Sequence, residues 1–438
     1  MEGEWQEVAI GDAFDVNPYR TIKRGQVTPF IPMDALPGHA RSASHIDERE
    51  FTGSGTKFQN GDTLIARITP CLENGKTVFV SGLSDGVVAH GSTEYIVLAG
   101  KPNQSDNLFA YYLARSPDFR RHAIGHMEGT SGRQRVPSVV VEKYVIALPP
   151  LPEQRAIAHI LGTLDDKIEL NRRMNETLEA MARALFKSWF VDFDPVRAKM
   201  EGRWRKGESL PGLPAHLYDL FPDSFEESEL GEIPRGWAVV PLPEAIEVNP
   251  TRSLRKGTVA PYLDMANMPT RGHSPDEVVE RALGSGMRFI NGDTLVARIT
   301  PCLENGKTAF VDFLDEGQVG WGSTEYIVLR PKSPLPDEYA YCLARSNEFR
   351  EFAIQSMTGS TGRQRVPAES LAHFPIAIAP KPIAEYFGLL IKPLFTRPSV
   401  ATKESRALTV VRDALLPMLI SGELRTRSFG AYAKVMIS

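Results

Sequence analysis

Asp62, Glu73 and Lys76 are the residues with the most evident catalytic potential, because they loosely match the metal site of a magnesium-dependent nuclease. Two carboxylates can hold a divalent cation, and a nearby lysine can stabilise charge on a cleaved phosphate. The spacing is wrong for this purpose, since the Asn-Gly turn at 74–75 separates the glutamate from the lysine. A nuclease therefore stays an alternative hypothesis only.

His122 and His126 lie four residues apart and could share a helix face as metal ligands. A second copy of this segment occurs later in the chain, with Phe352 and Ser356 at the two positions, so packed or surface histidines are the favoured interpretation. The sequence contains no GxxxxGK[ST], GxGxxG, HExxH, GxSxG or NPPY motif. No catalytic site is predicted.

The composition is that of an ordinary soluble chain of 438 residues, 42% apolar and 24% charged, long enough for two or three domains. It shows neither an apolar signal region near its start nor the roughly 18 to 20 apolar residues that cross a membrane. Three scattered cysteines exclude a disulfide framework, and a cytoplasmic location is expected. The formal net charge of −4 argues against a uniformly basic surface but permits a basic groove that binds nucleic acid.

A long internal repeat dominates the sequence. NGDTLIARITPCLENGKTVFV at 60–80 recurs at 291–311 with 19 of 21 positions identical. The match extends from Trp5 against Trp237 to the GRQRVP segments at 132–137 and 362–367, and its offset falls only from 232 to 230 residues. Such a period indicates a duplicated domain rather than a solenoid.

Each copy is expected to be a mixed α and β domain. DTLIARI, TVFV, EYIVL and YVIALP are short runs rich in β-branched or aromatic residues and bounded by turn signals, so they are predicted as strands. The segment 108–124 has the apolar spacing of a helix.

A long helix is expected after the first copy, from about Glu153 to Phe190, because apolar residues recur there in steps of three and four. Asn171 falls on this stripe, where a buried Asn could fix the register. The corresponding stripe near the end of the chain contains Pro393 and Pro398, which predict a bent or two-part helix. The simplest partner for each helix is the other one, packed antiparallel. The residues predicted to pack between the helices are Ile157, Leu164, Leu178, Leu185, Trp189, Leu408, Leu415 and Leu419, with Met181 and Val411 on the same stripes.

Two similar domains joined to long helices suit the recognition of two half-sites on one DNA molecule. The SGRQR and TGRQR loops offer Arg and Gln, which pair with guanine and adenine in the major groove. The basic KRG, RKG and ENGK segments could contact phosphates, although each could also be a solvated turn. The predicted DNA-contacting residues in these segments are Lys23, Arg24, Asn74, Lys76, Arg133, Gln134 and Arg135, with Arg255, Lys256, Asn305, Lys307, Arg363, Gln364 and Arg365 in the second copy.

Positions that differ between the copies are candidates for telling the half-sites apart. Residues 37–55 and 269–286 have little similarity, and His90 faces Trp321 immediately before GSTEY. His90 and Trp321 are therefore added to the predicted DNA-contacting residues, with ordinary loop drift as the alternative.

As far as about Arg425, the sequence resembles the specificity subunit of type I restriction–modification systems. ALPPLPEQRAIA at 147–158 and ALFKSWFVDFDPV at 184–196 are similar to the two ends of that family's central conserved helix. LGEIPRGW at 230–237 is similar to the start of its second recognition domain, and RDALLPMLISGEL at 412–424 to the end of its distal helix.

The resemblance implies an α+β fold: two duplicated mixed α/β target-recognition domains, separated by two long antiparallel, coiled-coil-like helical regions and related by a pseudo-twofold axis. The implied segments are recognition domain 1 at 1–150, a central helical region at 151–198, a linker at 199–229, recognition domain 2 at 230–380, a distal helical region at 381–425 and a tail at 426–438.

The resemblance also implies a chain without catalytic activity. Its partners would be double-stranded DNA, two methyltransferase subunits and, through the complex, restriction subunits. No cofactor or metal is expected in this subunit, since S-adenosylmethionine, ATP and magnesium would be used by the partners. Recognition domains in the family usually differ from each other, whereas these are close copies. We therefore expect a bipartite, near-palindromic target, and a scaffold that does not bind DNA is the second alternative.

Overall fold

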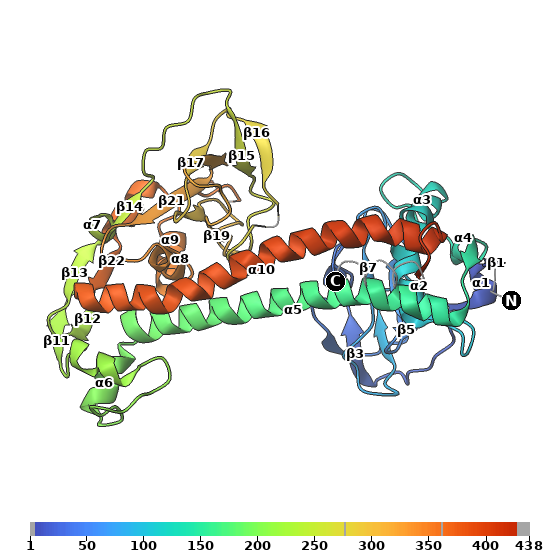
Figure 1. Ribbon diagram of the computed structural model, residues 1–438, viewed down its shortest axis with the longest axis horizontal. Helices are drawn as coiled ribbons and strands as arrows, with labels where there is room; N and C mark the ends of the chain where they lie inside the picture. Colours follow the sequence, from blue (N-terminus) through green and yellow to red (C-terminus); the bar gives the residue numbers. More distant parts are fainter. Residues whose placement is uncertain (1–4, 276, 361, 427–438) are drawn as a thin grey trace, which may run out of the picture. The chain divides into compact units, whose positions relative to one another are not determined.

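The computed structural model describes residues 5–275, 277–360 and 362–426, so most of the predicted tail lies outside the described residues. The chain forms two compact units (Figure 1). The first contains the described residues up to Leu170 and those from Glu404 on, and the second contains Asn171–Lys403. Each unit thus holds one copy of the repeat together with part of each long helix.

The first unit is built on two four-stranded sheets and a strand pair. One sheet has the order β2-β9-β6-β7 and is antiparallel, and the other has the order β4-β3-β8-β5 with β3 and β8 parallel. Its strands are β1 Gln6–Ala9, β2 Phe14–Val16, β3 Val27–Ile31, β4 Asp47–Glu50, β5 Thr56–Phe58, β6 Thr63–Ala66, β7 Thr77–Phe79, β8 Ala89–Gly91, β9 Tyr95–Gly100 and β10 Val145–Leu148. The four segments predicted as strands from their β-branched runs therefore form β6, β7, β9 and β10.

Both faces of the sheet that contains β6 are covered. Successive side chains of a strand point to opposite faces, and Leu64 and Ile65 accordingly lie in two different hydrophobic cores. Ile65 faces the short helices, including Phe109 of α2, whereas Leu64 packs with Phe58 of the second sheet. This is why the entire strand is buried and apolar.

The helical segment predicted at 108–124 is two helices. Ser116 separates α2 from α3, because its hydroxyl accepts a hydrogen bond from the Phe119 N–H and Pro117 occupies the first turn of α3. The short helices of this unit are α1 Ile10–Ala13, η1 Met33–Ala35, α2 Asn107–Arg115, α3 Pro117–Gly125 and α4 Ser138–Glu142.

The second unit repeats this topology. Its sheets have the orders β14-β21-β18-β19 and β16-β15-β20-β17, and β13 pairs with β22 as β1 pairs with β10. Its strands are β11 Phe225–Ser228, β12 Gly231–Pro234, β13 Ala238–Pro241, β14 Ile246–Val248, β15 Val259–Leu263, β16 Val279–Ala282, β17 Met287–Phe289, β18 Thr294–Ala297, β19 Thr308–Phe310, β20 Gly320–Gly322, β21 Tyr326–Pro331 and β22 Pro375–Ile378. Its short helices are α7 Leu242–Ala245, α8 Glu338–Ala344, α9 Asn347–Gln355 and η3 Ala368–His373.

Two long helices, α5 Leu151–Phe190 and α10 Lys381–Ser421, run antiparallel in each unit (Figure 1). In the first unit, Arg412 pairs with Asp165 at 2.7 Å, and Arg425, which follows α10, lies 3.7 Å from Glu153. The fold class expected from the sequence is therefore confirmed.

In the second unit the antiparallel pairing continues. The Asn171 side chain donates to the Ala401 carbonyl at 3.3 Å, and the Trp189 and Phe387 rings lie 5.7 Å apart. Asn171 is buried, as predicted from its place on the apolar stripe.

The two-part form predicted as one alternative for the second long helix is wrong, because α10 is continuous through Pro393 and Pro398. A helical proline cannot donate to the carbonyl four residues earlier. For Pro393 that carbonyl belongs to Leu389, which lies on the exposed side of α10. Buried Ile391 and Phe395 hold this part of α10 in the hydrophobic core of the second unit.

The residues predicted to pack on the helices are buried or half-buried. Ile157, Trp189 and Leu419 are buried, and Leu164, Leu178, Leu185, Leu408 and Leu415 are half-buried. Met181 and Val411 are 50% and 47% exposed, so their assignment to the packed stripes is wrong. Part of each stripe packs on the sheets and short helices of its unit rather than on the other long helix. The buried face of each long helix therefore differs from the face predicted for a helix pair alone.

The linker predicted at 199–229 is more ordered than a connecting loop. It follows α6 Asp194–Met200 and contains η2 Ala215–Leu220 and β11. Trp204, Leu217 and Phe221 are buried in the hydrophobic core of the second unit. The Gly and Pro content of this segment indicated turns. It did not show that a tryptophan and a phenylalanine anchor these turns in the core.

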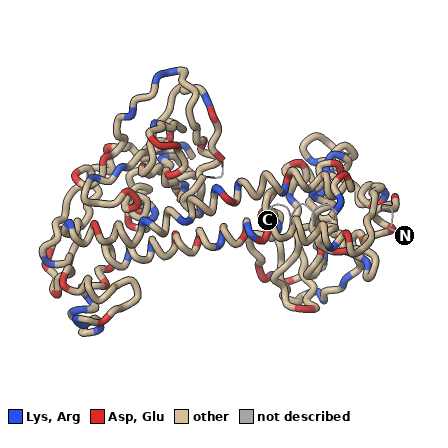
Figure 2. Tube along the Cα trace, viewed as in Figure 1, with Lys and Arg blue, Asp and Glu red and all other residues tan. Residues whose placement is uncertain are grey.

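Within the described ranges, no helix is long and apolar enough to cross a membrane. Lys and Arg alternate with Asp and Glu along the traces of both units (Figure 2), so neither unit is uniformly basic.

Removal of the buried Asp165 carboxylate should destabilise the first unit strongly. Asp165 and Arg412 are both buried, and the Tyr112 hydroxyl also donates to Asp165 at 2.7 Å. Asp165→Ala leaves a buried cation and a hydroxyl without this acceptor, which should cost about 3 kcal/mol of unfolding free energy.

The matched control is Glu404→Ala, which removes the exposed ion pair with Lys167 and should cost less than about 1 kcal/mol. Urea unfolding of the chain measures both variants. Equal, small effects would contradict a stabilising role for the buried contact.

Candidate nucleic-acid interface

Two polar segments leave one sheet of each unit at the same end. In the first unit β6 ends at Ala66 opposite Tyr95, and β7 begins at Thr77 opposite Ile65. The turn at 67–76 and the segment 92–94, which leads into Tyr95, therefore emerge together, and we call them, with the GRQR loop described next, the reading edge.

The GRQR loop is fastened to the turn at 67–76 by backbone bonds. The Thr69 N–H donates to the Gln134 carbonyl at 3.0 Å, and the Gln134 N–H donates back to the Thr69 hydroxyl at 3.0 Å. The Val136 N–H donates to the Arg67 carbonyl at 2.9 Å. Two segments whose bonded residues are 65 positions apart in the chain thus form a single surface.

The second unit has the same attachment. Thr300 and Gln364 exchange bonds of 3.1 Å in both directions, and the Val366 N–H donates to the Arg298 carbonyl at 2.9 Å. The repeated block is therefore half of a composite surface whose other half is the repeated GRQR segment.

Arg135 holds the loop instead of projecting from it. Its Nε and Nη2 atoms lie 2.9 and 2.7 Å from the Glu94 carboxylate, and the equivalent Arg365 atoms lie 2.9 and 2.8 Å from Glu325. The hydrogen bonds from Arg135 lower the pKa of Glu94 below its usual value. These two arginines were predicted to contact DNA, but the structure commits their guanidinium groups to a carboxylate.

Arg133 and Arg363 are the available cations of the two loops. Both are exposed, and their side chains have no hydrogen-bond or ion-pair partner among the described residues. Gln134 and Gln364 are half-buried beside them. These four positions stay candidates for contact with bases or phosphates.

The lysine of each ENGK turn points inward. Lys76 Nζ donates to the Met33 carbonyl at 2.9 Å, and Lys307 Nζ donates to the Met265 and Ala266 carbonyls at 2.5 and 3.1 Å. Their predicted phosphate contact conflicts with this arrangement, because the ammonium groups tie the turn to a neighbouring loop. Asn74 and Asn305 are exposed at the tip and stay candidates.

The remaining basic candidates precede β3 and β15, and they lie away from the reading edge, because these strands are parallel to β8 and β20, which end next to it. Lys23 and Arg24, and Arg255 and Lys256 in the second copy, are all exposed. Their charges are available to phosphates.

His90 and Trp321 are in the core, which corrects their prediction as DNA contacts. Each is only 4% exposed. His90 Nδ1 lies 3.0 Å from the Thr28 hydroxyl, and Trp321 Nε1 donates to the Arg281 carbonyl at 3.1 Å. The difference between the copies at this position therefore changes the packing of the sheet that contains β8 or β20. It does not change an exposed side chain.

The residues of the nuclease hypothesis do not converge. Asp62 precedes β6, whereas Glu73 and Lys76 follow it. Asp62 is 2% exposed and its two oxygens lie 2.8 and 2.6 Å from Arg20. Burial raises the pKa of Asp62 to about 6, although Arg20 opposes the shift.

Within the described residues, no group of three or more His, Cys, Asp or Glu side chains could hold a metal ion. His126 Nδ1 lies 2.8 Å from the His122 carbonyl, and the His122 ring packs on Tyr144 at 4.5 Å. This arrangement is that of packed histidines.

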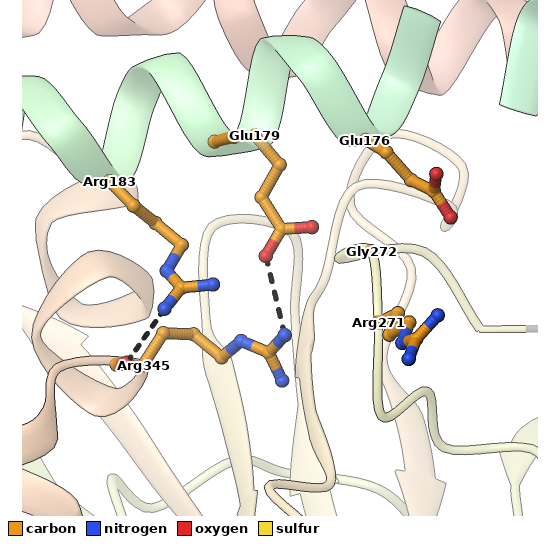
Figure 3. A pocket seen from close by; sticks show the side chains of 7 residues that line it. Glu176, Glu179, Arg183, Arg271, Gly272 and Arg345 are labelled. Atoms are coloured by element: carbon orange, nitrogen blue, oxygen red, sulfur yellow. Dashed lines mark hydrogen bonds and ion pairs between the residues drawn. The ribbon is translucent and has the colours of Figure 1, made fainter. Parts of the chain in front are cut away.

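A pocket in the second unit lies between α5 and the loop at 271–272 (Figure 3). Glu179 of α5 is buried there, accepts a hydrogen bond from the Tyr341 hydroxyl at 2.7 Å and lies 3.5 Å from Arg345. In the first unit, Tyr112 and Asp165 make the corresponding contact. The buried contacts of this pocket attach the recognition domain to its helix.

Two kinds of functional residue were missed from the sequence. Thr69 and Thr300 receive the loop, and Glu94 and Glu325 hold its arginine. All four lie in segments identical between the copies, which was the available signal, but nothing in the spacing showed that these segments touch the GRQR loop.

The sequence is similar to those of known specificity subunits. Residues 2–180 match the type I restriction modification DNA specificity domain family. The HindI specificity subunit of Haemophilus influenzae is 26% identical over 96% of this chain and 100% of its own length. The MjaIX specificity subunit of Methanocaldococcus jannaschii is 26% identical over 72% of this chain and 69% of its own length.

A solved structure shares the fold. The type I restriction–modification S subunit from M. genitalium superposes with a TM-score of 0.54, covering 95% of this chain and 96% of that chain at 14% identity.

The chain therefore contains a match to the DNA specificity domain family in its first unit, and its second unit repeats the same sheet topology. It is a homologue of the type I restriction–modification specificity subunits, as the motifs predicted. The prediction of a non-catalytic recognition subunit is likewise confirmed by these relatives.

Loss of the ion pair between Arg135 and Glu94, which we call the latch, should increase the mobility of the GRQR loop. Glu94→Gln removes the charge that holds the guanidinium, so amide exchange should rise in residues 128–136 and stay unchanged in 358–366. Glu325→Gln should do the converse and serves as the matched control. Hydrogen–deuterium exchange measures both, and uniform protection in the variants would contradict the latch.

The latch also has a defined pH dependence. Because the pKa of Glu94 is lowered in the folded chain, its contribution is fully present above the pKa of an unfolded glutamate and is lost as the pH falls through the lowered value.

Proposed function

We propose that each recognition domain reads one half of a bipartite DNA site through its reading edge. One observation supports this proposal. In each unit the loop with exposed Arg133 or Arg363 is hydrogen-bonded to the turn that the two copies share. Arginine on a rigid loop can pair with guanine in the major groove or contact a phosphate.

The two half-sites should be similar and inverted. The attachments of the two reading edges agree to within about 0.1 Å in their bond lengths, so the same frame is offered to DNA twice. In the proposed complex the two copies of this frame read similar sequences on opposite strands. The target is then a near-palindrome interrupted by a fixed gap, set by the helices.

The helices also dock the methyltransferase subunits in this proposal. Each unit exposes apolar residues on its part of α5 and α10: Leu170, Val410 and Val411 in the first, and Met181, Leu389 and Val400 in the second. Exposed apolar side chains on an ordered helix favour a protein partner. Two such surfaces support two methyltransferase copies, with restriction subunits joining through the complex.

The chain itself is proposed to use no cofactor. S-adenosylmethionine would be bound by the methyltransferase partners, and ATP and magnesium by the restriction partners. The proposed place of action is the cytoplasm, where the DNA and these partners are found together.

Modified adenines mapped in DNA exposed to the chain and its methyltransferase partners should define an interrupted, near-palindromic motif. Two unrelated half-sites would contradict the symmetry, and no motif at all would contradict DNA recognition. Arg133→Ala should weaken discrimination at one half-site by about 1–3 kcal/mol per lost contact. Arg363→Ala is its matched counterpart and should act at the other half-site, while unchanged motifs in both variants would rule out the loop assignment.

Charge placed on the exposed apolar surface of one unit should release one methyltransferase subunit. Leu389 and Val400 are eleven residues apart on α10, about three turns, and so share a face. Leu389→Glu with Val400→Glu should reduce the partner stoichiometry from two toward one by native mass spectrometry. Leu389→Met with Val400→Ile, which keeps the same two positions apolar, is the control, and two bound subunits in the charged double variant would contradict docking at this surface.

A further inference from the structure

Arg67 lies where the segments of the first reading edge meet. It is the first residue of the turn at 67–76, directly after β6. Its N–H donates to the Glu94 carbonyl at 2.9 Å, and its own carbonyl accepts from the N–H of Val136, which follows the GRQR loop, at 2.9 Å. The backbone of Arg67 is therefore bonded to both of the other segments of the edge, which places the residue on the surface proposed to meet DNA.

The guanidinium group of Arg67 is half-buried and has no partner of its own. Its Nε atom is shielded from water and makes no hydrogen bond. Among the described residues, neither Nη atom has a hydrogen-bond or ion-pair partner, and neither is among the buried atoms. Partial removal of a cation from water without a partner costs free energy. An anion that binds this group would recover part of that cost.

The carboxylate of Glu94 does not neutralise Arg67, because Arg135 occupies it with contacts of 2.7 to 2.9 Å. The pKa of Glu94 is lowered first by these hydrogen bonds from Arg135 and then, against the effect of burial, by the charges of Arg135 and Arg67. Two arginines thus share one negative charge, and exposed Arg133 adds a further cation to the edge. Exposed Glu73, at the tip of the turn, makes no ion pair with Arg67 among the described residues.

The second unit has the same unpaired arginine. The Arg298 N–H donates to the Glu325 carbonyl at 2.9 Å, and its own carbonyl accepts from the Val366 N–H at 2.9 Å. Its Nε atom is likewise buried without a partner, while Arg365 occupies the Glu325 carboxylate. Because the two backbones are bonded in the same way, both reading edges present the same unpaired charge.

We propose that Arg67 and Arg298 each bind a DNA phosphate and so position their recognition domain on the duplex. The inference rests on the proposed recognition of two half-sites. A guanidinium group can direct two N–H donors at one phosphate, and the Nη atoms are the ones that reach solvent here. A phosphate contact fixes the register of the protein but carries no sequence information. The same residue therefore serves both units, whichever bases each domain reads.

The salt dependence of DNA binding tests the proposal in the chain assembled with methyltransferase subunits. The dissociation constant is measured over a range of salt concentrations, for a duplex with the mapped motif and for duplexes with single base-pair changes in it. Arg67→Gln should lower the slope of log Kd against log salt concentration by about 0.9, the value for one phosphate contact. Arg67→Gln with Arg298→Gln should lower it by about twice as much. Affinity should fall by the same factor on all of these duplexes.

Two controls separate this contact from a general effect of charge. Arg67→Lys keeps a cation that binds phosphate as a point charge, so it should retain the slope. Arg49 is exposed and paired with Asp47 at 2.9 Å, and it lies opposite Thr28, near the start of β3 and away from the reading edge. Arg49→Gln should leave the slope and the affinity unchanged.

Urea unfolding provides a second readout. The unfolding midpoint of the Arg67→Gln variant should stay close to that of the unchanged chain, because no hydrogen bond or ion pair of the side chain is lost. A lower midpoint, together with a loss of affinity that Arg67→Lys does not restore, would overturn the proposal, since Arg67 would then act through the fold.

The remaining outcomes distinguish this inference from the function on which it rests. An unchanged slope in Arg67→Gln, or a preference lost at one base pair only, would overturn the phosphate contact and leave half-site recognition intact. A fall in slope that Arg49→Gln reproduces would also overturn it, because general charge would then explain the effect. No bipartite motif from the unchanged complex would overturn both.

Discussion

The burial of the apolar stripes of α5 and α10 against the recognition domains is the constraint on which the structure depends. In the second unit Trp189, Phe190 and Phe387 share one core with Tyr339 of the recognition domain. In the first unit Ile157, Leu161 and Leu419 pack with the short helices of its domain. Neither helix pair nor domain has a complete core alone, so the position of each reading edge follows from how its domain sits on its part of the helices.

Polar contacts add direction to this apolar packing. Apolar burial is largely non-directional, whereas the buried carboxylates Asp165 and Glu179 each accept from one tyrosine hydroxyl of the neighbouring domain. The two units make this contact with different residues, at different positions of α5. A buried carboxylate without its partners would be costly, which restricts the domain to one placement on its helix.

In the reading edges, the residues that hold the loops in place differ from the residues that are exposed for a DNA contact. Identical segments provide the bonds that join loops, such as those of Thr69 and Gln134, and the carboxylate that holds Arg135. Arg133 and Arg363 project from this frame and are exposed. Near-identity of the frame therefore permits the chain to present two similar surfaces.

The sequence by itself determined the duplication, the strands built from β-branched runs, the long helices and the family resemblance, because local periodicity and internal repetition need no knowledge of distant contacts. It placed Arg133 and Arg363 correctly on exposed loops. Only the tertiary structure decided that α10 stays one continuous helix at its prolines and that His90 and Trp321 are buried. It also decided that the charged groups of Lys76 and Arg135 already have partners within the chain. Each of these outcomes depends on partners distant in the chain, such as Met33 for Lys76 and Glu94 for Arg135, and no spacing along a strand or helix encodes them.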